Sequence, residues 1–206
     1  MIKLYDYWRS SASYRVRIAL GLANEQWETQ SVNLLEGAQR SGDHLARNPQ
    51  GLVPVLEIDG QRLTQSLGII EYLDETRNLG LLPATPIARA DVRGLSYVIA
   101  METHPICNLN VAKWAVEKSD QQISMKSWMA HFITNGLEAY EQMIKGNDFS
   151  FGKSVTLADI CLMPQLYNAE RWGVALHAYP KISRIKETLD AIPAFQRAHP
   201  DETPKA

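Results

Sequence analysis

The residue types best suited to chemistry lie where the first strand gives way to a helix. The hydroxyl pair Ser10-Ser11 follows a short apolar strand pattern, 2–6, and opens directly into a helical pattern, 11–23. Free backbone N–H groups and the positive end of the helix dipole converge at a helix N-terminus, so this place favours an anion such as a thiolate. An ordinary serine N-cap on a core helix explains the same residues without any ligand.

Two further places combine strand or helix starts with groups that could bind a ligand. Pro54 cannot donate to a sheet ladder, so it is expected at the start of a strand, where a cis Val53-Pro54 bond is compatible. A Val53 backbone turned outward could pair with an extended peptide ligand. Gln65-Ser66 opens a helix whose first amides could hold a carboxylate. A strand-start proline and a helix cap are the structural alternatives, and only the combination with Ser10 predicts a ligand site.

The patterning around these residues changes once along the chain. In the first 80 residues, strand patterns alternate with helical ones, and Asp59-Gly60 signals a tight hairpin turn. The expected strands are 2–6, 27–32, 55–58 and 62–64, and the expected helices are 11–23, 38–47 and 65–76. We therefore predict an α/β domain over 1–80 with the order β-α-β-α-β-β-α.

The second part of the chain follows a linker, 81–86, which is rich in proline, and is patterned almost entirely as helix. The expected helices are 87–116, 121–144, 157–172 and 182–191, followed by a frayed polar tail, 200–206. These elements predict an all-α domain over 87–206. Thr156 and Asp159 fit a capping box at the start of the third of these helices.

Composition limits the classes of partner. The 206 residues carry a net charge of −2, so no strong field draws nucleic acid or an anionic membrane, and Arg15 and Arg17 are expected on the solvated face of their helix. No signal peptide is expected, and no apolar run approaches the roughly 18–20 residues of a membrane span. Cys107 and Cys161 are expected to be reduced, buried thiols of a cytoplasmic protein. The histidines lack metal-ligand spacing, so no metal is expected.

The whole pattern resembles the cytosolic glutathione transferases. The resemblance rests on the element order, on Val53-Pro54, on the segment 65–73 (Gln-Ser-Leu-Gly-Ile-Ile-Glu-Tyr-Leu) and on the helical region that follows. Residues 10–20, Ser-Ser-Ala-Ser-Tyr-Arg-Val-Arg-Ile-Ala-Leu, are similar to the signature of the zeta class. The resemblance extends over about residues 2–200. It implies a thioredoxin-like first domain, an all-helical second domain, glutathione as cofactor and a homodimer.

The zeta class implies an activity as well. Its members are maleylacetoacetate isomerases, with bacterial maleylpyruvate isomerases as relatives. The resemblance thus implies glutathione-dependent conversion of maleylacetoacetate to fumarylacetoacetate in tyrosine and phenylalanine catabolism, by thiolate addition, bond rotation and elimination. A general transferase acting on small electrophiles, a maleylpyruvate isomerase and a non-catalytic binding module are the alternatives.

The resemblance also assigns roles to single positions. Ser10 would donate its hydroxyl to the glutathione sulfur, with Ser11 beside it. The other positions implied for glutathione are Gln39 at the glycyl end, Val53 at the cysteinyl backbone, and Gln65 and Ser66 at the γ-glutamyl group. His104, Asn108, Leu109 and Asn110 match positions that border the active-site cleft and are counted with the glutathione site.

The resemblance implies a site for an anionic substrate. Arg171 matches a position that receives a substrate carboxylate, although it could instead form a helix-end charge pair with Glu170. Trp8 is expected to wall the substrate pocket. Arg9 is either a carboxylate partner or a surface charge. One departure stands out, because Ala12 occupies the position of the signature's usual cysteine, so that thiol has no direct role here.

Overall fold

The computed structural model describes residues 1–120 and 122–205. The chain forms two compact units, of which one comprises Met1–Gly80 together with the chain from Asp190 onward, and the other comprises Leu81–Leu189. The sequence-based division placed the last segment in the helical domain. In the structure this segment packs on helix α1 (Ser11–Leu22), and it therefore belongs to the first unit.

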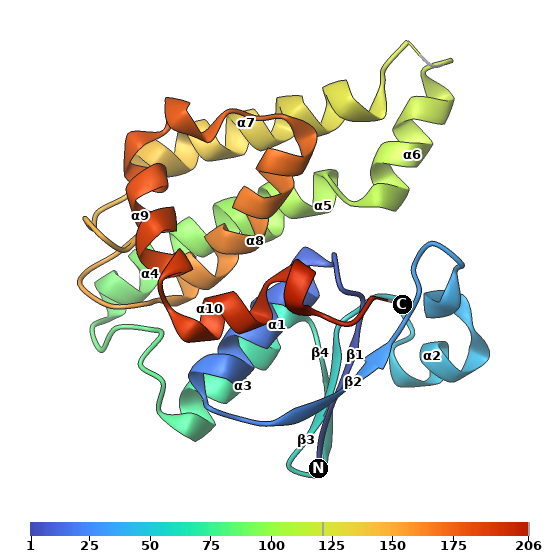
Figure 1. Cartoon of the computed structure of the whole chain (residues 1–206), viewed down its shortest axis with the longest axis horizontal. Helices are drawn as coiled ribbons and strands as arrows, with labels where there is room; N and C mark the ends of the chain where they lie inside the picture. The colour runs from blue at the N-terminus through green and yellow to red at the C-terminus, as the bar shows by residue number, and fades with distance from the viewer. Residues whose placement is uncertain (121, 206) are drawn as a thin grey trace. The chain divides into compact units, whose positions relative to one another are not determined.

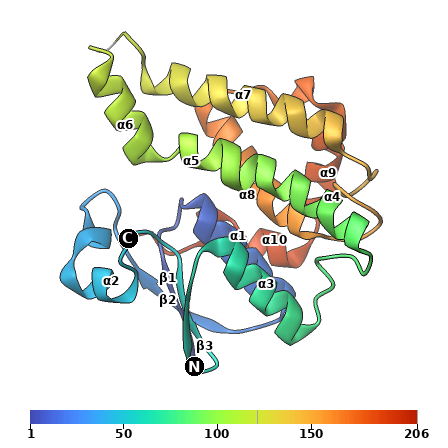
Figure 2. The same cartoon turned by 180° about the vertical axis from the view of Figure 1, so that it is seen from behind.

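The first unit is built on a mixed sheet with the strand order β2-β1-β3-β4. Its strands are β1 (Ile2–Asp6), β2 (Trp27–Ser31), β3 (Val55–Ile58) and β4 (Gln61–Thr64). β1 runs parallel to β2 and antiparallel to β3, which forms the predicted hairpin with β4. Helices α1 and α3 (Ser66–Arg77) lie on one face of the sheet and α2 (Gly42–Arg47) on the other (Figures 1 and 2). The predicted element order is confirmed.

Several local predictions for this unit are wrong. The single helix expected over 38–47 is divided into a short 3-10 helix, Ala38–Arg40, and α2, because Ser41 is extended (φ −62°, ψ 151°) and its side chain accepts the His44 N–H. The expected fraying fails for residues 200–203, since Pro200–Glu202 form a 3-10 helix and Thr203 is buried. The expected tail also included residue 206, which lies outside the described residues. Helix α10 (Pro193–Ala198) was not predicted.

The arginines of α1 contradict the sequence-based expectation most clearly. Arg15 and Arg17 are each only 2% exposed, not solvated. Arg17 Nη1 donates to both Asp6 carboxylate oxygens at 2.9 and 2.7 Å. Its Nε donates to the Ala198 carbonyl and its Nη2 to the Trp8 carbonyl, both at 3.0 Å. The Arg17 side chain thus hydrogen-bonds to β1, to the turn after β1 and to the end of α10, and it holds these three segments together.

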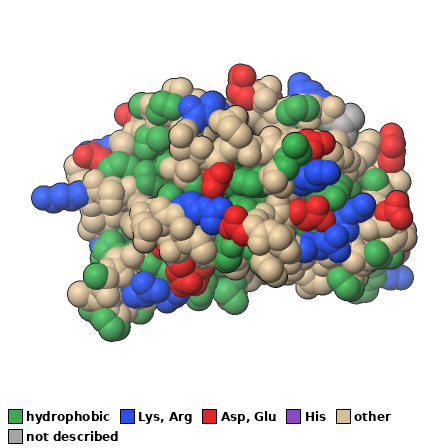
Figure 3. Space-filling view, turned by 90° about the horizontal axis from the view of Figure 1, so that it is seen from below, with side chains coloured by type: hydrophobic (Ala, Val, Ile, Leu, Met, Phe, Trp, Pro, Cys, Tyr) green, Lys and Arg blue, Asp and Glu red, His purple; other side chains and the backbone are tan. Residues whose placement is uncertain are grey.

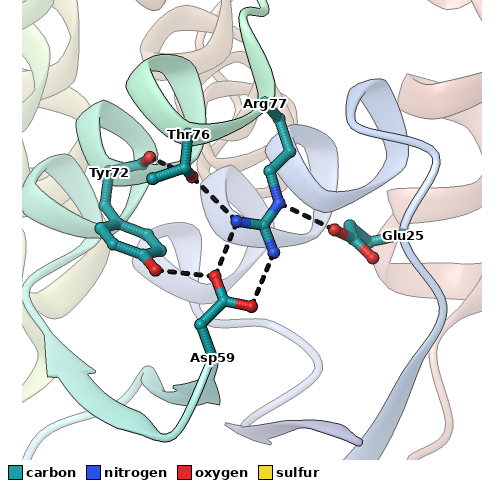
Figure 4. Close-up of polar contacts among 5 residues, drawn as sticks. All are labelled: Glu25, Asp59, Tyr72, Thr76 and Arg77. Atoms are coloured by element: carbon teal, nitrogen blue, oxygen red, sulfur yellow. Dashed lines mark hydrogen bonds and ion pairs between the residues drawn. The ribbon is translucent and has the colours of Figure 1, made fainter.

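The far end of α3 is fixed to the β3–β4 hairpin. Asp59 (φ 52°) and Gly60 (φ 74°) form the predicted turn with left-handed backbone. Arg77 Nη1 and Nη2 donate to the Asp59 carboxylate at 2.6 and 2.9 Å, and Arg77 Nε donates to Glu25 at 2.9 Å. Tyr72 donates its hydroxyl to the same aspartate at 2.7 Å (Figure 4). These bonds set the direction of α3 and hence the place of its first turn.

The second unit is helical, with one π-helical segment, Val98–Thr103, and a short 3-10 helix, Leu176–Ala178. Its α-helices are α4 (Pro86–Tyr97), α5 (His104–Ile106), α6 (Leu109–Lys118), α7 (Met125–Met143), α8 (Leu157–Trp172) and α9 (Pro180–Asp190). The expected start of a helix at residue 121 lies outside the described residues, and α7 begins at Met125 after its N-cap Ser124.

The single helix expected over 87–116 is wrong. After the π-helical segment the chain turns at Cys107, and Asn108 has an extended backbone (φ −63°, ψ 135°). Pro105 has no N–H to continue the helical ladder. The Asn108 side chain accepts the Asn110 N–H at 3.0 Å and so begins a new helix.

The predicted capping box of α8 is confirmed. Asp159 accepts the Thr156 N–H at 2.8 Å and its hydroxyl at 3.0 Å, and it also accepts the Ser150 N–H at 2.7 Å. Its side chain is fully buried, so desolvation raises the pKa of the carboxyl, against the lowering effect of these hydrogen bonds. The box therefore ties the start of α8 to the preceding loop.

The surface shows no dominance of one charge sign on the face drawn in Figure 3, where Lys and Arg side chains are interspersed with Asp and Glu. None of the helices in the described part of the chain combines the length and the apolar character that crossing a bilayer requires.

The Asp59 interactions predict a defined acid dependence of stability. Hydrogen bonds from Arg77 and then Tyr72 lower the pKa of the Asp59 carboxyl from 3.8 to about 2. A carboxyl whose pKa falls on folding adds stability above its unfolded pKa, and this is lost as the pH falls through the folded pKa. We expect Asp59→Asn to lower the Tm by a constant amount above pH 4, with the difference from wild type disappearing between pH 3.8 and about 2. A difference that persists unchanged at pH 2 in thermal unfolding by circular dichroism contradicts the assignment.

Candidate active site

The Ser10 turn has the geometry that the sequence predicted. Ser10 is extended (φ −69°, ψ 119°) and its Oγ accepts the Ser13 N–H at 3.2 Å, which makes it the N-cap of α1. Its own N–H donates to the Tyr7 carbonyl at 2.7 Å and closes the turn. The capping bond uses only a lone pair of Oγ, because an N–H can only donate. The Ser10 hydroxyl hydrogen can therefore still serve an anion at the N-terminus of α1, where Ser11 is buried beside it.

Two cationic side chains lie beside the Trp8 ring, one from the turn before Ser10 and one from the end of the chain. The guanidinium carbon of Arg9 lies 4.4 Å from the centroid of the Trp8 ring, and Lys205 Nζ lies 5.1 Å from it. Arg9 Nη2 also donates to the Tyr7 hydroxyl at 3.3 Å. Arg9 is thus held by two neighbours and is not a loose surface charge. The role of Trp8 and Arg9 toward a substrate remains a prediction.

The segment before β3 packs in a small hydrophobic cluster that includes Tyr7. The Val53-Pro54 bond is cis. Val53 packs in a cluster with Tyr7 and Val32, and the paired residues of β3 begin only at Val55. Val53 therefore precedes the ladder, as its predicted role requires.

Gln39 lies in the 3-10 helix Ala38–Arg40. Ala38, its neighbour in the chain, packs against the cluster of Tyr7, Val32 and Val53. The Gln39 Oε1 atom is buried and has no hydrogen-bond partner among the residues that the structure describes. A buried amide of this kind has unused capacity for a polar ligand.

Helix α3 begins with Ser66. Gln65 has a left-handed φ of 67° and its side chain does not cap α3. Its Nε2 instead donates to Gln50 Oε1 at 2.7 Å. Ser66 is 6% exposed and its Oγ accepts from Arg15 Nη1 at 3.2 Å. Sequence reasoning missed both Gln50 and Arg15. No local signal marks Gln50, whereas Arg15 lies within the zeta-class signature.

In the second unit, three of the predicted site residues lie together at the N-terminus of α6. Asn108 is the N-cap of α6, and Leu109 and Asn110 are exposed in its first turn. His104 is the first residue of α5, directly after the π-helical segment, and is half-buried. The structure thus groups Asn108, Leu109 and Asn110 at a helix N-terminus, one turn after His104.

Arg171 lies in the last turn of α8 and is exposed. Its Nη1 donates to Asn168 Oδ1 at 3.2 Å. Its guanidinium carbon lies 5.8 Å from the Tyr167 ring centroid and 5.7 Å from that of Trp172. The neighbouring Glu170 lies 3.7 Å from Lys186 Nζ. These contacts hold the Arg171 fork at an accessible position, where it can bind a carboxylate through two nitrogens.

The two thiols of the chain are unsuited to nucleophilic attack. Burial raises the pKa of Cys107 to about 11, so its thiol is protonated at neutral pH. Cys161 is completely buried in α8. With Ala12 at the signature position, any reactive sulfur must come from a ligand. The described residues also hold no cluster of His, Cys, Asp and Glu able to bind a metal ion.

Comparisons with known proteins show the family of the chain. Residues 1–75 match the glutathione S-transferase N-terminal domain, and residues 107–197 match the glutathione S-transferase C-terminal domain. The maleylacetoacetate isomerase of Rhizobium meliloti is 56% identical over 203 residues, which are 96% of this chain and 95% of that protein. The chain belongs to the zeta class of the glutathione S-transferases.

Two solved structures are similar to the chain over nearly its whole length. The holo structure of a bacterial maleyl pyruvate isomerase, described as a glutathione S-transferase of the zeta class, superposes with a TM-score of 0.94 at 36% identity, covering 99% of this chain and all of that one. A maleylacetoacetate isomerase from Anaeromyxobacter dehalogenans with glutathione bound in its active site superposes with a TM-score of 0.88 at 41% identity, covering 100% and 98%. The predicted fold class, a thioredoxin-like domain with an all-helical one, is confirmed.

The capping role of Ser10 predicts a modest loss of stability on truncation. Ser10→Ala removes the acceptor of the Ser13 N–H, and we expect the free energy of unfolding to fall by about 1 kcal/mol. Ser10→Thr keeps the acceptor and should cost less. Urea unfolding followed by circular dichroism measures both variants. Equal stability of wild type and Ser10→Ala would show that the bond does not cap α1.

Proposed function

We propose that the protein is a glutathione-dependent cis-trans isomerase that converts maleylacetoacetate to fumarylacetoacetate. The observation that supports it best is the N-cap Ser10, whose hydroxyl hydrogen is not used in capping, at the head of α1. This feature occurs in a chain that is 56% identical to the Rhizobium meliloti maleylacetoacetate isomerase. The first unit would bind glutathione and the helical unit would bind the substrate.

The residues of the first unit fit glutathione. An extended tripeptide with two carboxylates needs hydrogen-bond groups at both ends and a place for its thiol. The Ser66 hydroxyl and the first-turn amides of α3 suit the γ-glutamyl carboxylate, with Gln65 for the neighbouring amine. The Val53 backbone before β3 suits the cysteinyl residue. The unpartnered, buried amide oxygen of Gln39 can accept the glycyl N–H, but not bind the glycyl carboxylate, because an amide oxygen and a carboxylate both only accept.

Bound glutathione supplies the sulfur that can add to an activated cis double bond and leave it again. The chain's part is to keep that sulfur ionised, and the Ser10 hydroxyl donates to it while the dipole of α1 favours negative charge there. Arg171 receives a carboxylate of the substrate and stabilises negative charge that develops on its oxygens. Arg9 adds a second positive group beside Trp8.

Maleylpyruvate is the second candidate substrate. The TM-score of 0.94 with a maleyl pyruvate isomerase favours it, and both substrates offer a carboxylate to Arg171. On the family resemblance, maleylpyruvate isomerases carry arginines shortly after the histidine that matches His104. This chain has Leu109 and Asn110 there instead, which favours maleylacetoacetate.

Location, assembly and pathway follow from the same proposal. Cys107 and Cys161 are free thiols, which suits a cytoplasmic protein. We further propose a homodimer, and a role in tyrosine and phenylalanine catabolism. Light scattering after size-exclusion chromatography that gives only the monomer mass would remove the dimer from the account.

The decisive assay follows maleylacetone, a small analogue of maleylacetoacetate, to its trans isomer with and without glutathione. We expect rapid conversion only with glutathione and no net loss of the thiol. Arg171→Ala should raise the KM for maleylacetone about tenfold, because a charge-assisted contact to a carboxylate is lost. Lys181→Ala, an exposed change on α9, is the matched control and should leave KM unchanged.

The outcomes separate the alternatives. Conversion of maleylpyruvate but not of maleylacetone would move the assignment to the second candidate. Conjugation of small electrophiles without isomerisation would indicate a general transferase, and absence of glutathione binding would indicate a non-catalytic module. Full activity of Arg171→Ala would remove Arg171 from the substrate site.

A further inference from the structure

A buried arginine of α1 contacts the first residue of α3. Arg15 lies in α1 and is only 2% exposed, and its Nη1 donates to Ser66 Oγ at 3.2 Å. Ser66 is the first residue of α3 and is itself 6% exposed. A hydrogen bond between these two buried side chains joins the helix that carries Ser10 to the helix that begins with Ser66.

The direction of this bond is fixed by chemistry. A guanidinium has only donors, so Ser66 Oγ must be the acceptor. A serine hydroxyl also has one hydrogen, which this bond leaves for a second partner that accepts. Arg15 therefore turns Ser66 into a donor with a preferred direction.

The first turn of α3 lacks the usual cap. The side chain of Gln65, its N-cap residue, makes no capping bond and pairs with Gln50 instead. Gly68 is exposed, and a Cβ built on it would meet no atom within 4 Å, so this turn borders open space. The first N–H groups of α3 and the Ser66 hydroxyl are thus donors in need of an acceptor, and an anionic one suits the helix dipole.

Arg15 adds charge as well as direction. A guanidinium stays protonated at any pH at which the protein is folded. Its charge is screened little by water in a buried place, so it acts on an anion near Ser66 more strongly than a surface arginine would.

We propose that Arg15 is a positioning residue for the γ-glutamyl carboxylate of glutathione, acting through Ser66. The inference rests on the proposed function only in that glutathione is the ligand. It predicts that Arg15 contributes to the part of the affinity that comes from the γ-glutamyl group, and to no other part.

The test compares two ligands by calorimetry, glutathione and cysteinylglycine, which lacks the γ-glutamyl group. In wild type, glutathione should bind much more tightly. In Arg15→Met the ratio of the two dissociation constants should fall at least about tenfold, because glutathione binding weakens and cysteinylglycine binding does not. Arg15→Lys should recover part of the loss, since it restores the charge without the guanidinium fork. At saturating glutathione, kcat should stay at the wild-type value.

Two further variants of the chain make the test more specific. In a Ser66→Ala background, Arg15→Met should cause a smaller additional loss, because the two residues act on one carboxylate. Arg62→Met makes the same change at an exposed arginine on β4, paired with Glu57, and should leave the ratio unchanged. Circular dichroism and Tm values confirm that each variant is folded.

The results can be told apart. Wild-type binding of glutathione together with an unchanged ratio in folded Arg15 variants overturns the inference and leaves the proposed function standing. Equal weakening of both ligands, or failure of both Arg15 variants to fold, makes Arg15 a structural residue and also overturns it. A selective loss for glutathione in a protein without isomerase activity supports the inference and overturns the activity. Wild-type protein that binds no glutathione overturns both.

Discussion

The buried ion pair between Arg17 and Asp6 is the interaction on which the first unit depends. The two side chains are 2% and 1% exposed, and a charge in such a place is tolerated only when it is paired and hydrogen-bonded. Arg17 meets this condition, because Nη1 binds both Asp6 oxygens while Nε and Nη2 bind the carbonyls of Ala198 and Trp8. The end of β1, the turn that leads to Ser10 and the end of α10 are thereby fixed by one side chain.

The same helix controls a second place through its other buried arginine. Arg15 and Arg17 are two positions apart on α1, and residues at this spacing do not face each other. Arg17 reaches toward β1 and α10, whereas Arg15 reaches toward Ser66 at the start of α3. One helix therefore supports both helix N-termini at which an anion is expected. Such support, prepared before the ligand arrives, is what keeps donors at a fixed distance from a charge that they must stabilise.

Much of the fold follows from local patterns. The strands, α1, α3 and the Asp59-Gly60 hairpin were predicted because each is specified by residues next to one another. The capping box of Thr156 and Asp159 was predicted for the same reason. Helix α10 was missed, because what stabilises it is packing on α1, which is distant in sequence. The 3-10 helix Pro200–Glu202 was missed because it packs on α10 in turn.

The site was predictable to a similar extent. Ser10 and Ser66 could be found because a serine at a strand-to-helix turn has a clear local meaning. Arg15 and Arg17 were wrongly expected in solvent, since a charge in a helical pattern is normally exposed and nothing nearby shows its partners. Asp6 precedes Arg17 by eleven residues and Ala198 follows it by 181. Only the folded chain brings these groups together.

The most direct test of the account measures the pKa of the thiol of glutathione bound to the protein, by titrating the ultraviolet absorbance of the thiolate. If Ser10 and the N-terminus of α1 stabilise an anionic sulfur, this pKa lies at least about one unit below that of free glutathione, and Ser10→Ala raises it toward the free value. A bound thiol that titrates like free glutathione, in wild type and in Ser10→Ala alike, would contradict the account.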